Sequence, residues 1–403
     1  MQKSSQYQAA LEILTEVLQD KFPADNLINN YLKARKYIGS KDRKAIAQTV
    51  WDIIRNRMKL EFDCNSKNPR DLLLTYLKNE DLNTLCGTLE YGLNSLNNKE
   101  KEMLANLSEE VYPPFVEAEM PKWLYEKIDN DALAKSLNKP APADFRVNLS
   151  NRDDVINELQ KEGLYVAKTP YSPLGIRSKD RINVNNCAVY QEGKIEIQDE
   201  ASQIAAILCD VKTEHKIVDY CAGAGGKSLA LAAILNGKGC VFAHDVNKSR
   251  LKPLPERMKR LNIRNIVIKN EITDTDFDRF VVDAPCSGSG TFRRSPDAKF
   301  RLTPEKISEL NKIQLEVLEF AYNHTKIGGE IVYITCSVLT QENQDIINEF
   351  LARHNGCKLV NLHSRWQQKI GDFFPFDDEF MLSFSPFKTG TDGFFVAILK
   401  KIS

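Results

Sequence analysis

The sequence predicts an α/β protein in which helices wrap a parallel sheet, preceded by an all-α N-terminal domain. From about residue 198 onward, apolar runs of strand length alternate with segments of helix length, the order of elements found in parallel sheets. Before residue 140, apolar residues instead recur only at helical spacing. Parallel sheets bind ligands in the crevice at the carboxyl ends of their strands, so functional residues are expected there.

Composition places the chain among ordinary water-soluble proteins. Of its 403 residues, 42% are hydrophobic and 27% are charged, and no run approaches the roughly 18 apolar residues of a membrane span. The N-terminal MQKSSQYQAA lacks the features of a secretory signal, so we expect a cytoplasmic protein. Basic and acidic residues number 55 each, which argues against a uniformly basic surface but permits a local basic groove.

The nine cysteines indicate neither a disulfide framework nor a metal site. Their number is odd, and the chain has no C-x-x-C pair and no histidine cluster at metal-ligand spacing. We therefore expect no metal. Taken singly, each is first interpreted as a small buried hydrophobe in a reducing compartment, so a functional role must come from local context. The positions are Cys64, Cys86, Cys187, Cys209, Cys221, Cys240, Cys286, Cys336 and Cys357.

The N-terminal domain, residues 1–140, is predicted to be a group of short amphipathic helices. Its apolar residues recur three and four positions apart, as in Ala10, Ile13, Leu14, Val17 and Leu18, and again in Ile46, Val50, Trp51, Ile53 and Ile54. Prolines are frequent from 112 to 142, around one short helix, which is typical of a connecting region. This places a domain boundary near residue 140.

Two further domains are expected after that boundary. Residues 141–197 read as a small mixed α+β subdomain, with a strand at 145–149, a helix at 153–162 and short strands from Tyr165. Residues 198–403 read as the catalytic domain. Its predicted helices are 199–208, 227–235, 247–261 and 304–325, and its predicted strands are 216–220, 240–244, 266–269, 279–283 and 330–335.

The first strand of this domain ends in a glycine-rich turn, IVDYCAGAGGKS, between strand and helix. Glycines there let the backbone approach a ligand, with a helix N-terminus behind it; the alternative is a merely tight connection. A phosphate-binding Walker loop would need glycine where the chain has Cys221, and a dinucleotide fingerprint would need glycine or alanine where it has Ser228. Both are therefore poor interpretations.

An acidic residue before the turn favours S-adenosylmethionine as the ligand instead. Asp219 precedes the glycines, and Asp245 follows the second strand, where a carboxylate can accept both hydroxyl protons of a ribose. The competing interpretation of Asp245 is a helix cap.

Cysteines follow two other strands, in FDRFVVDAPCSGSG and GGEIVYITCSV. The carboxyl ends of parallel strands share one crevice, so Cys286 and Cys336 are expected to converge although they are far apart in the chain. Cytosine C5 is a poor nucleophile, and addition of a thiolate to C6 turns C5 into an enamine carbon that can attack a sulfonium methyl group. The pair thus fits methyl transfer to cytosine.

At this point the sequence resembles the Sun family of RNA cytosine-C5 methyltransferases, in particular its RsmB-like bacterial ribosomal-RNA branch. The resemblance implies a Rossmann-like, S-adenosylmethionine-dependent methyltransferase sheet. The N-terminal helices, including IGSKDRKAIAQTVWDIIRNR, are similar to the NusB-like RNA-binding domain of this branch. The matching segments are QDEASQ (198–203), CAGAGGK (221–227), DAPCSGSGTFRRSPD (283–297), Gln314, GGEIVYITCSV (328–338), Glu342–Asn343 and DGFFVA (392–397).

The resemblance assigns roles that the residues alone leave open. It implies that Cys336, in the T-C dipeptide, is the nucleophile, and that Cys286, in the P-C dipeptide, assists release of the methylated RNA. DNA cytosine methyltransferases use the P-C cysteine, so the reverse assignment stays open. Asp283 is expected to hydrogen-bond the cytosine edge, helping to protonate N3, and to line the cofactor site; otherwise it caps a strand end. Lys227 is expected to lower a cysteine pKa or hold the base; otherwise it is a helix-start cation.

The residues after the P-C cysteine are basic. Arg293 and Arg294, followed by Lys299 and Arg301, are expected to contact RNA phosphates, the alternative being a solvated loop. Phe292 either stacks on a base or packs in the protein.

Two departures from the family pattern concern the cofactor. The usual C-A-A-P-G-G-K has Gly223 and Ala224 here in place of alanine and proline, which removes no side-chain ligand. The aspartate expected at the adenine amine is replaced by Glu271, or by Asn270 if the register slips. The expected cofactor contacts are Cys221, Ala222, Gly223, Ala224, Gly225, Gly226, Lys227, Asp245, Glu271 and Asp283.

The leading hypothesis is therefore methylation of cytosine C5 in RNA, most directly small-subunit ribosomal RNA, by a monomer. Transfer RNA is the alternative substrate. A ribosome-assembly factor whose methyl transfer is secondary is a second hypothesis, although binding alone requires neither the cysteine pair nor the glycine turn. A small-molecule methyltransferase would leave the helical domain and the cysteine pair unexplained.

Overall fold

The computed structural model describes residues 1–179 and 182–403 and divides them into two compact units. The first consists of residues 1–139 and 292–302, and the second of residues 140–291 and 303–403. This division differs from the three expected domains in two respects. The mixed subdomain belongs to the same unit as the methyltransferase sheet, and a short segment inside the expected catalytic domain belongs to the helical unit.

The first unit is helical throughout its described residues. Its helices are α1 (Lys3–Val17), α2 (Ala24–Ala34), α3 (Ser40–Arg55), α4 (Arg57–Cys64), α5 (Pro69–Tyr76), α6 (Leu82–Leu85), α7 (Asn98–Ala105), α8 (Pro114–Glu117), α9 (Lys122–Ile128), α10 (Asp131–Ser136) and α16 (Ala298–Arg301). The periodic residues predicted to face the core do so: Ala10 and Leu14 of α1 and Ile46 and Val50 of α3 are fully buried. No helix among residues 1–179 and 182–403 is long and apolar enough to cross a membrane.

The segment 292–302 is held in this unit by buried polar contacts. A carboxylate oxygen of Asp297 accepts a hydrogen bond from the Ala24 backbone N–H at 2.9 Å, at the start of α2. The Lys299 ammonium donates to the Asn138 side-chain carbonyl at 2.9 Å and is only 1% exposed. Burial lowers the pKa of Lys299 to about 7, and burial raises the pKa of nearby Glu119 to about 7. Lys299 is therefore an internal residue of the helical unit and does not lie on a solvated loop.

The small sheet of the second unit has strand order β2-β3-β1-β4, and its neighbouring strands pair antiparallel. The strands are β1 (Ala143–Val147), β2 (Ala167–Lys168), β3 (Gly175–Ser178) and β4 (Ile195–Ile197), with helices α11 (Arg152–Lys161) and α12 (Ala188–Gln191). The predicted strand at 145–149 thus begins and ends two residues earlier, and the predicted helix at 153–162 is observed one residue earlier.

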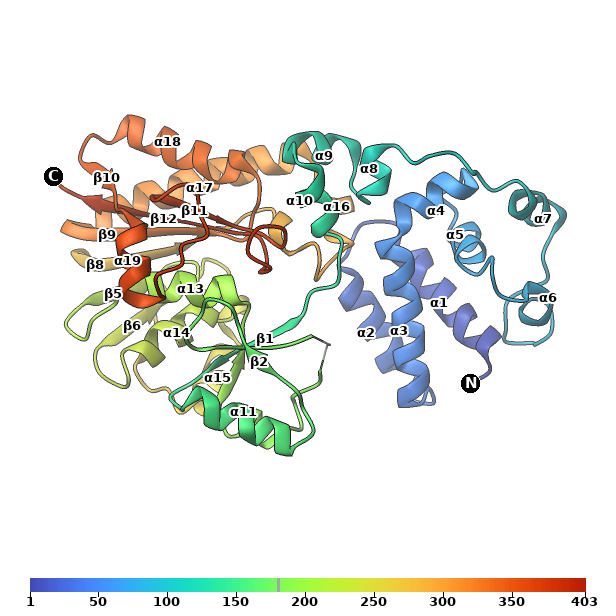
Figure 1. The fold of residues 1–403 in the computed structure, drawn as a ribbon, viewed down its shortest axis with the longest axis horizontal. Helices are drawn as coiled ribbons and strands as arrows, with labels where there is room; N and C mark the ends of the chain where they lie inside the picture. The colour runs from blue at the N-terminus through green and yellow to red at the C-terminus, as the bar shows by residue number, and fades with distance from the viewer. Residues whose placement is uncertain (180–181) are drawn as a thin grey trace. The chain divides into compact units, whose positions relative to one another are not determined.

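The large sheet has eight strands, seven of them in the order β10-β12-β9-β8-β5-β6-β7, while β11 pairs with β12 (Figure 1). Five neighbouring strands, up to the edge strand β7, are parallel: β5 (Lys216–Asp219), β6 (Cys240–Ala243), β7 (Ile266–Ile268), β8 (Phe277–Asp283) and β9 (Thr325–Thr335). The antiparallel strands are β10 (Cys357–Leu359), β11 (Met381–Phe384) and β12 (Phe394–Lys401). The predicted Rossmann-like α/β class is confirmed.

Helices cover both faces of this sheet, as the nearly continuous burial along strands such as β8 and β9 requires. One core includes Ile217, Val281 and Val332 and residues of α13 (Glu200–Leu208), α14 (Gly226–Ile234) and α19 (Leu362–Lys369). The other includes Val218 and Tyr333 and residues of α17 (Pro304–His324) and α18 (Gln344–Arg353). The two sets of strand residues alternate because successive side chains point to opposite faces.

One predicted helix is broken. The expected continuous helix 247–261 is a 3₁₀ turn at Lys248–Leu251 followed by α15 (Leu254–Arg260). Pro253 and Pro255 lack the N–H groups that a continuous helix would need at this point. The helix restarts at Leu254, and Pro255 lies in its first turn, where an N–H needs no partner within the helix.

Candidate active site

The two predicted cysteines meet at the carboxyl edge of the parallel strands. Cys286 follows β8 and Cys336 follows β9, and their sulfur atoms lie 3.3 Å apart within hydrogen-bonding distance. Both thiols are half-buried and unoxidised. The hydrogen bond with Cys336, together with burial, raises the pKa of Cys286 well above its ordinary value. Cys286 is therefore the member of the pair that retains its proton.

An ion pair between a buried lysine and a half-buried aspartate lies beside the thiols. The Lys227 ammonium, at the start of α14, lies 2.7 Å from a carboxylate oxygen of Asp283 at the end of β8. Burial alone would lower the pKa of Lys227, but Asp283 and then Asp219 and Cys336 raise it above its usual value. Lys227 is 6% exposed and stays protonated, so it supplies a fixed positive charge to this edge of the sheet.

A carboxylate that sequence reasoning gave no role connects the two cysteine loops. Glu342 is fully buried, and its Oε1 accepts hydrogen bonds from the Ser287 backbone N–H at 2.8 Å and from the Gln314 amide at 3.2 Å. Its Oε2 accepts from the Ser287 hydroxyl and, at 2.5 Å, from the Ser337 hydroxyl. Ser287 and Ser337 are the residues directly after the two cysteines. One carboxylate therefore holds the loop after Cys286 and the loop after Cys336 together.

The glycine turn has the backbone that its sequence predicts. Gly225 has φ of 82°, and a Cβ atom there would lie 2.3 Å from a methyl carbon of Leu254. Gly223 has φ of 54°, also in the left-handed region. A Cβ atom at Gly226 would meet no heavy atom within 4 Å, so open space adjoins the turn there.

Asp245 ties the turn to the end of the second strand. Its Oδ2 accepts a hydrogen bond from the Gly223 backbone N–H at 2.9 Å, and its Oδ1 accepts from the Asn247 N–H at 2.8 Å. The second contact is of the kind expected for a cap. The first was not anticipated, because it joins two strand ends. Oδ2 also lies 3.3 Å from the Arg250 guanidinium. Oδ1 retains a second lone pair, so the carboxylate can still accept a ligand hydroxyl group.

Asp219 is a buried acceptor with spare capacity. It is fully buried, its Oδ2 accepts the Ser228 hydroxyl at 2.6 Å, and within the described residues its Oδ1 has no hydrogen-bond partner. Burial raises the pKa of Asp219 to about 6. An unsatisfied carboxylate oxygen beside open space at a glycine turn fits a ligand that carries hydroxyl and ammonium donors, as S-adenosylmethionine does.

This buried carboxylate predicts a pH-dependent stability. Asp219 titrates near pH 4 when unfolded and near pH 6 when folded, so the folded protein binds the proton more tightly and loses stability as pH rises through this window. The Asn side chain of Asp219→Asn cannot ionise. The free energy of unfolding of this variant minus that of the wild type is therefore expected to be about 2 kcal/mol larger at pH 8 than at pH 4.5. Urea unfolding at both values measures the difference. Asp345→Asn, at an exposed site on α18, is the control, and a gain independent of pH would contradict the prediction.

The remaining predicted site residues differ in exposure. Asn270 and Glu271 are both exposed after β7, which leaves the choice between them open. Phe292 is 1% and Arg293 is 4% exposed, whereas Arg294 is half-buried. Phe292 therefore packs in the protein in this structure.

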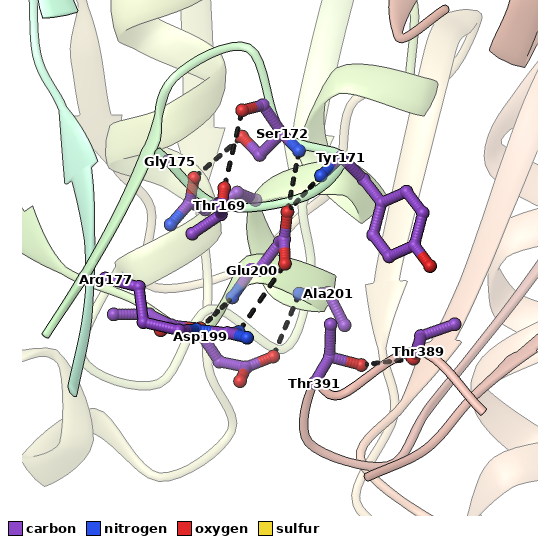
Figure 2. Close-up of polar contacts among 12 residues, drawn as sticks. Thr169, Tyr171, Ser172, Gly175, Arg177, Asp199, Glu200, Ala201, Thr389 and Thr391 are labelled. Atoms are coloured by element: carbon purple, nitrogen blue, oxygen red, sulfur yellow. Dashed lines mark hydrogen bonds and ion pairs between the residues drawn. The ribbon is translucent and has the colours of Figure 1, made fainter. Parts of the chain in front are cut away.

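The QDEASQ motif has a structural role (Figure 2). The Glu200 Oε1 accepts hydrogen bonds from the backbone N–H groups of Tyr171 and Ser172, at 2.6 and 2.8 Å, in the small sheet's loop. Asp199 accepts from the Asp392 backbone N–H at 3.0 Å, in the C-terminal DGFFVA motif. Two motifs that are distant in the sequence thus join the small sheet, α13 and β12 into one unit.

Comparison with known protein families identifies the methyltransferase part of the chain. Residues 206–400 match the model of the 16S rRNA methyltransferase RsmB/F family. Ribosomal RNA small subunit methyltransferase B of Pseudomonas syringae is 30% identical over 324 residues, covering 76% of this chain and 71% of that protein. The probable enzyme of the same name from Bacillus subtilis is 32% identical over 280 residues, and the chain spans 60% of its length.

Solved structures share the fold. The structure of PH0851 superposes with a TM-score of 0.77 and 25% identity, covering 100% of this chain and 99% of that one. NSun6 from Pyrococcus horikoshii with SFG, an analogue of S-adenosylmethionine, has a TM-score of 0.63 and 21% identity, covering 71% of this chain and 100% of that one. At this identity the second likeness concerns the fold alone.

Proposed function

Because the chain belongs to the RsmB/F family of 16S rRNA methyltransferases, we propose that it methylates C5 of a cytosine in small-subunit ribosomal RNA, using S-adenosylmethionine. The observation that carries this proposal is the thiol pair 3.3 Å apart beside the Lys227–Asp283 ion pair. Methyl transfer to oxygen or nitrogen requires no such pair, whereas transfer to C5 needs a nucleophile to activate the ring.

Cys336 is the nucleophile in this mechanism. Its thiolate forms a bond to C6 of the cytosine, and the electron pair moves toward N3, which takes up a proton, so that C5 becomes an enamine carbon. When bound, S-adenosylmethionine would supply an electrophilic methyl group from its sulfonium, and the sulfonium would leave as a neutral thioether. A base then removes the C5 proton, and the C6–sulfur bond breaks to restore the aromatic ring and the Cys336 thiolate. Cys286, which retains its proton, assists this release.

Lys227 and Asp283 prepare the site for that attack. The Lys227 ammonium lies close enough to Cys336 to stabilise negative charge that develops on its sulfur, and Cys336 is one of the groups, after Asp283 and Asp219, that raise the pKa of Lys227. Asp283 holds Lys227 with one oxygen and has further acceptor capacity for the cytosine edge, where it helps protonate N3. The ion pair thus acts on both the nucleophile and the base.

The glycine turn and its carboxylates would hold the cofactor. We propose that the backbone of the turn from Cys221 to Lys227 contacts the cofactor closely. Asp245 would accept hydrogen bonds from the ribose hydroxyls, and Asp283 would line the part of the cofactor site that adjoins the cytosine. Glu271 or Asn270 would accept from the adenine amine.

We further propose that the helical unit is a NusB-like RNA-binding domain, with Arg293 and Arg294 contacting phosphates. The half-buried Arg294 has the greater access of the two. The enzyme is proposed to act as a monomer in the cytoplasm, where its ribosomal substrate is made.

Transfer of a labelled methyl group tests the proposal. The purified chain is incubated with labelled S-adenosylmethionine and either small-subunit ribosomal RNA or transfer RNA, and the nucleosides are separated by mass spectrometry. We expect 5-methylcytosine in the ribosomal RNA, which bisulfite sequencing then maps. Label confined to transfer RNA would favour that alternative substrate, and label that is never found in 5-methylcytosine would overturn the proposal.

A further inference from the structure

The helical unit contains a groove lined by aromatic residues. Its volume is about 660 Å³, and its walls come from α1, α2, the connection after α2 and the segment 90–94. The side chains that matter here are Tyr31, Arg35, Tyr37, Tyr91 and Glu12. We call this feature the tyrosine groove.

Part of the groove is already ordered. The Tyr31 hydroxyl donates a hydrogen bond to a Glu12 carboxylate oxygen at 2.7 Å, and the Arg35 guanidinium lies 3.4 Å from the same oxygen. The guanidinium carbon of Arg35 lies 3.5 Å from the centre of the Tyr31 ring, a cation–π contact. These contacts hold the three side chains together along one wall of the groove.

Two further tyrosines of the groove face solvent. Tyr37 is 76% exposed and Tyr91 is 77% exposed, which leaves most of each ring uncovered. Exposed aromatic rings that line a hollow can serve as stacking platforms, because every nucleic-acid base has a flat face of similar size.

Positive charge is concentrated beside the groove. Residues 1–139 contain 20 Lys and Arg against 21 Asp and Glu, yet residues 33–44 contain six of those basic residues and one acidic residue, Asp42. Four lysines of this segment are exposed and form no ion pair within the part of the chain that the structure describes. They are Lys33, Lys36, Lys41 and Lys44.

The backbone of this basic segment is fixed by Arg43. Its guanidinium donates to the backbone carbonyls of Ile38 at 2.8 Å, Leu32 at 2.6 Å and Arg35 at 3.0 Å. The connection between α2 and α3 is therefore held in one conformation. Lys36 lies in this connection, Lys33 lies at the end of α2, and Lys41 and Lys44 lie at the start of α3. Arg43 is engaged with the backbone and Arg35 with Glu12, so the four lysines supply the available charge.

We propose that the tyrosine groove and residues 33–44 form a binding site for single-stranded RNA. Bases stack on Tyr37 and Tyr91, and phosphates contact the lysines, among them Lys36, which directly precedes Tyr37. A polyanion with flat bases fits both observations, whereas an apolar protein partner would account for the aromatic rings but not for the four available lysines of residues 33–44. This inference rests on RNA being the substrate and adds the element that holds RNA outside the catalytic crevice.

Binding measurements on the full chain test the inference. The probes are a fluorescent single-stranded oligoribonucleotide and the same strand in a duplex. The Tyr37→Ala/Tyr91→Ala variant is expected to bind the single strand about tenfold more weakly and the duplex as the wild type does. In the Lys36→Gln/Lys41→Gln variant, the affinity for RNA is expected to fall less steeply with salt concentration. The change in slope should correspond to the loss of about one to two phosphate contacts.

Matched controls come from the same unit. Phe22→Ala replaces an aromatic residue that is 62% exposed, and Lys99→Gln/Lys101→Gln removes two exposed lysines on or near α7; both are expected to bind RNA as the wild type does. Thermal unfolding verifies that each variant is folded. Unchanged single-strand affinity in the tyrosine variant, or equal losses in the controls, would overturn the inference and leave a protein partner as the occupant. Methyl transfer by the wild type is scored separately, so failure of the groove would not be confused with failure of the proposed activity.

Discussion

Replacing Cys286 with alanine is expected to trap the enzyme on its RNA. Replacing Cys336 with alanine is expected to lower the rate of methyl transfer by about 10⁴-fold or more. The difference follows from the two roles. Without Cys336 no bond to C6 forms, so C5 is never activated. Without Cys286 the bond forms and methylation proceeds, but release of Cys336 slows, and a protein–RNA adduct accumulates.

Denaturing gel electrophoresis measures the trapped species. Each variant is incubated with S-adenosylmethionine and labelled ribosomal RNA, and the adduct appears as label that migrates with the protein after denaturation. The double variant Cys286→Ala/Cys336→Ala should form none. Cys240→Ala is the matched control and should turn over normally, because this half-buried cysteine lies at the amino end of β6, opposite the carboxyl edge of the parallel strands. Adduct formation by Cys336→Ala, with none by Cys286→Ala, would reverse the two roles.

Removing the charge of Glu342 is expected to lower kcat about 100-fold with little change in KM for RNA. Removing one well-placed hydrogen-bond donor from an active site lowers kcat by a similar factor. Glu342→Gln keeps the size of the side chain. It replaces one acceptor oxygen by an amide that cannot accept from the serine hydroxyls, so the Ser287 and Ser337 loops lose their shared partner. The RNA contacts lie elsewhere, so binding should persist.

A measurement without RNA separates this role from a general loss of structure. The negative charge of Glu342 raises the pKa of Cys286, so Glu342→Gln should lower that pKa and let Cys286 react with iodoacetamide at a lower pH than in the wild type. Peptide mass spectrometry reports the rate at each cysteine. Glu342→Asp, which keeps the charge, should retain the wild-type pH profile. Glu349→Gln, at an exposed position of α18, is the control. A wild-type turnover and alkylation profile in Glu342→Gln would contradict this assignment.

Much of the fold was predictable because its signals are local. The period of apolar residues identified most helices and strands, and the glycines of the turn were recognisable because their backbone requires positive φ at Gly223 and Gly225. The approach of Cys286 and Cys336 was also predictable, since parallel strands end at one edge. The prediction of one continuous helix over 247–261 was wrong. It followed the spacing of the apolar residues and took no account of Pro253 and Pro255.

Other features had no local signal. Glu342 looked like any acidic residue after a strand, and only the packed loops revealed that it accepts from both cysteine neighbours. Lys299 belonged to a basic stretch that predicted a solvated surface, yet it is buried in the helical unit. The antiparallel pairing of β12 with β9 was likewise not predicted.

The sequence by itself therefore determined the class of fold, the cofactor turn and the pair of thiols, because each depends on periodicity, backbone conformation or strand direction. Only the tertiary structure decided which carboxylate joins the two cysteine loops, which basic residues face solvent, and where segment 292–302 belongs. Those properties depend on residues far apart in the chain, and burial and hydrogen-bond partners are settled only when such segments pack together.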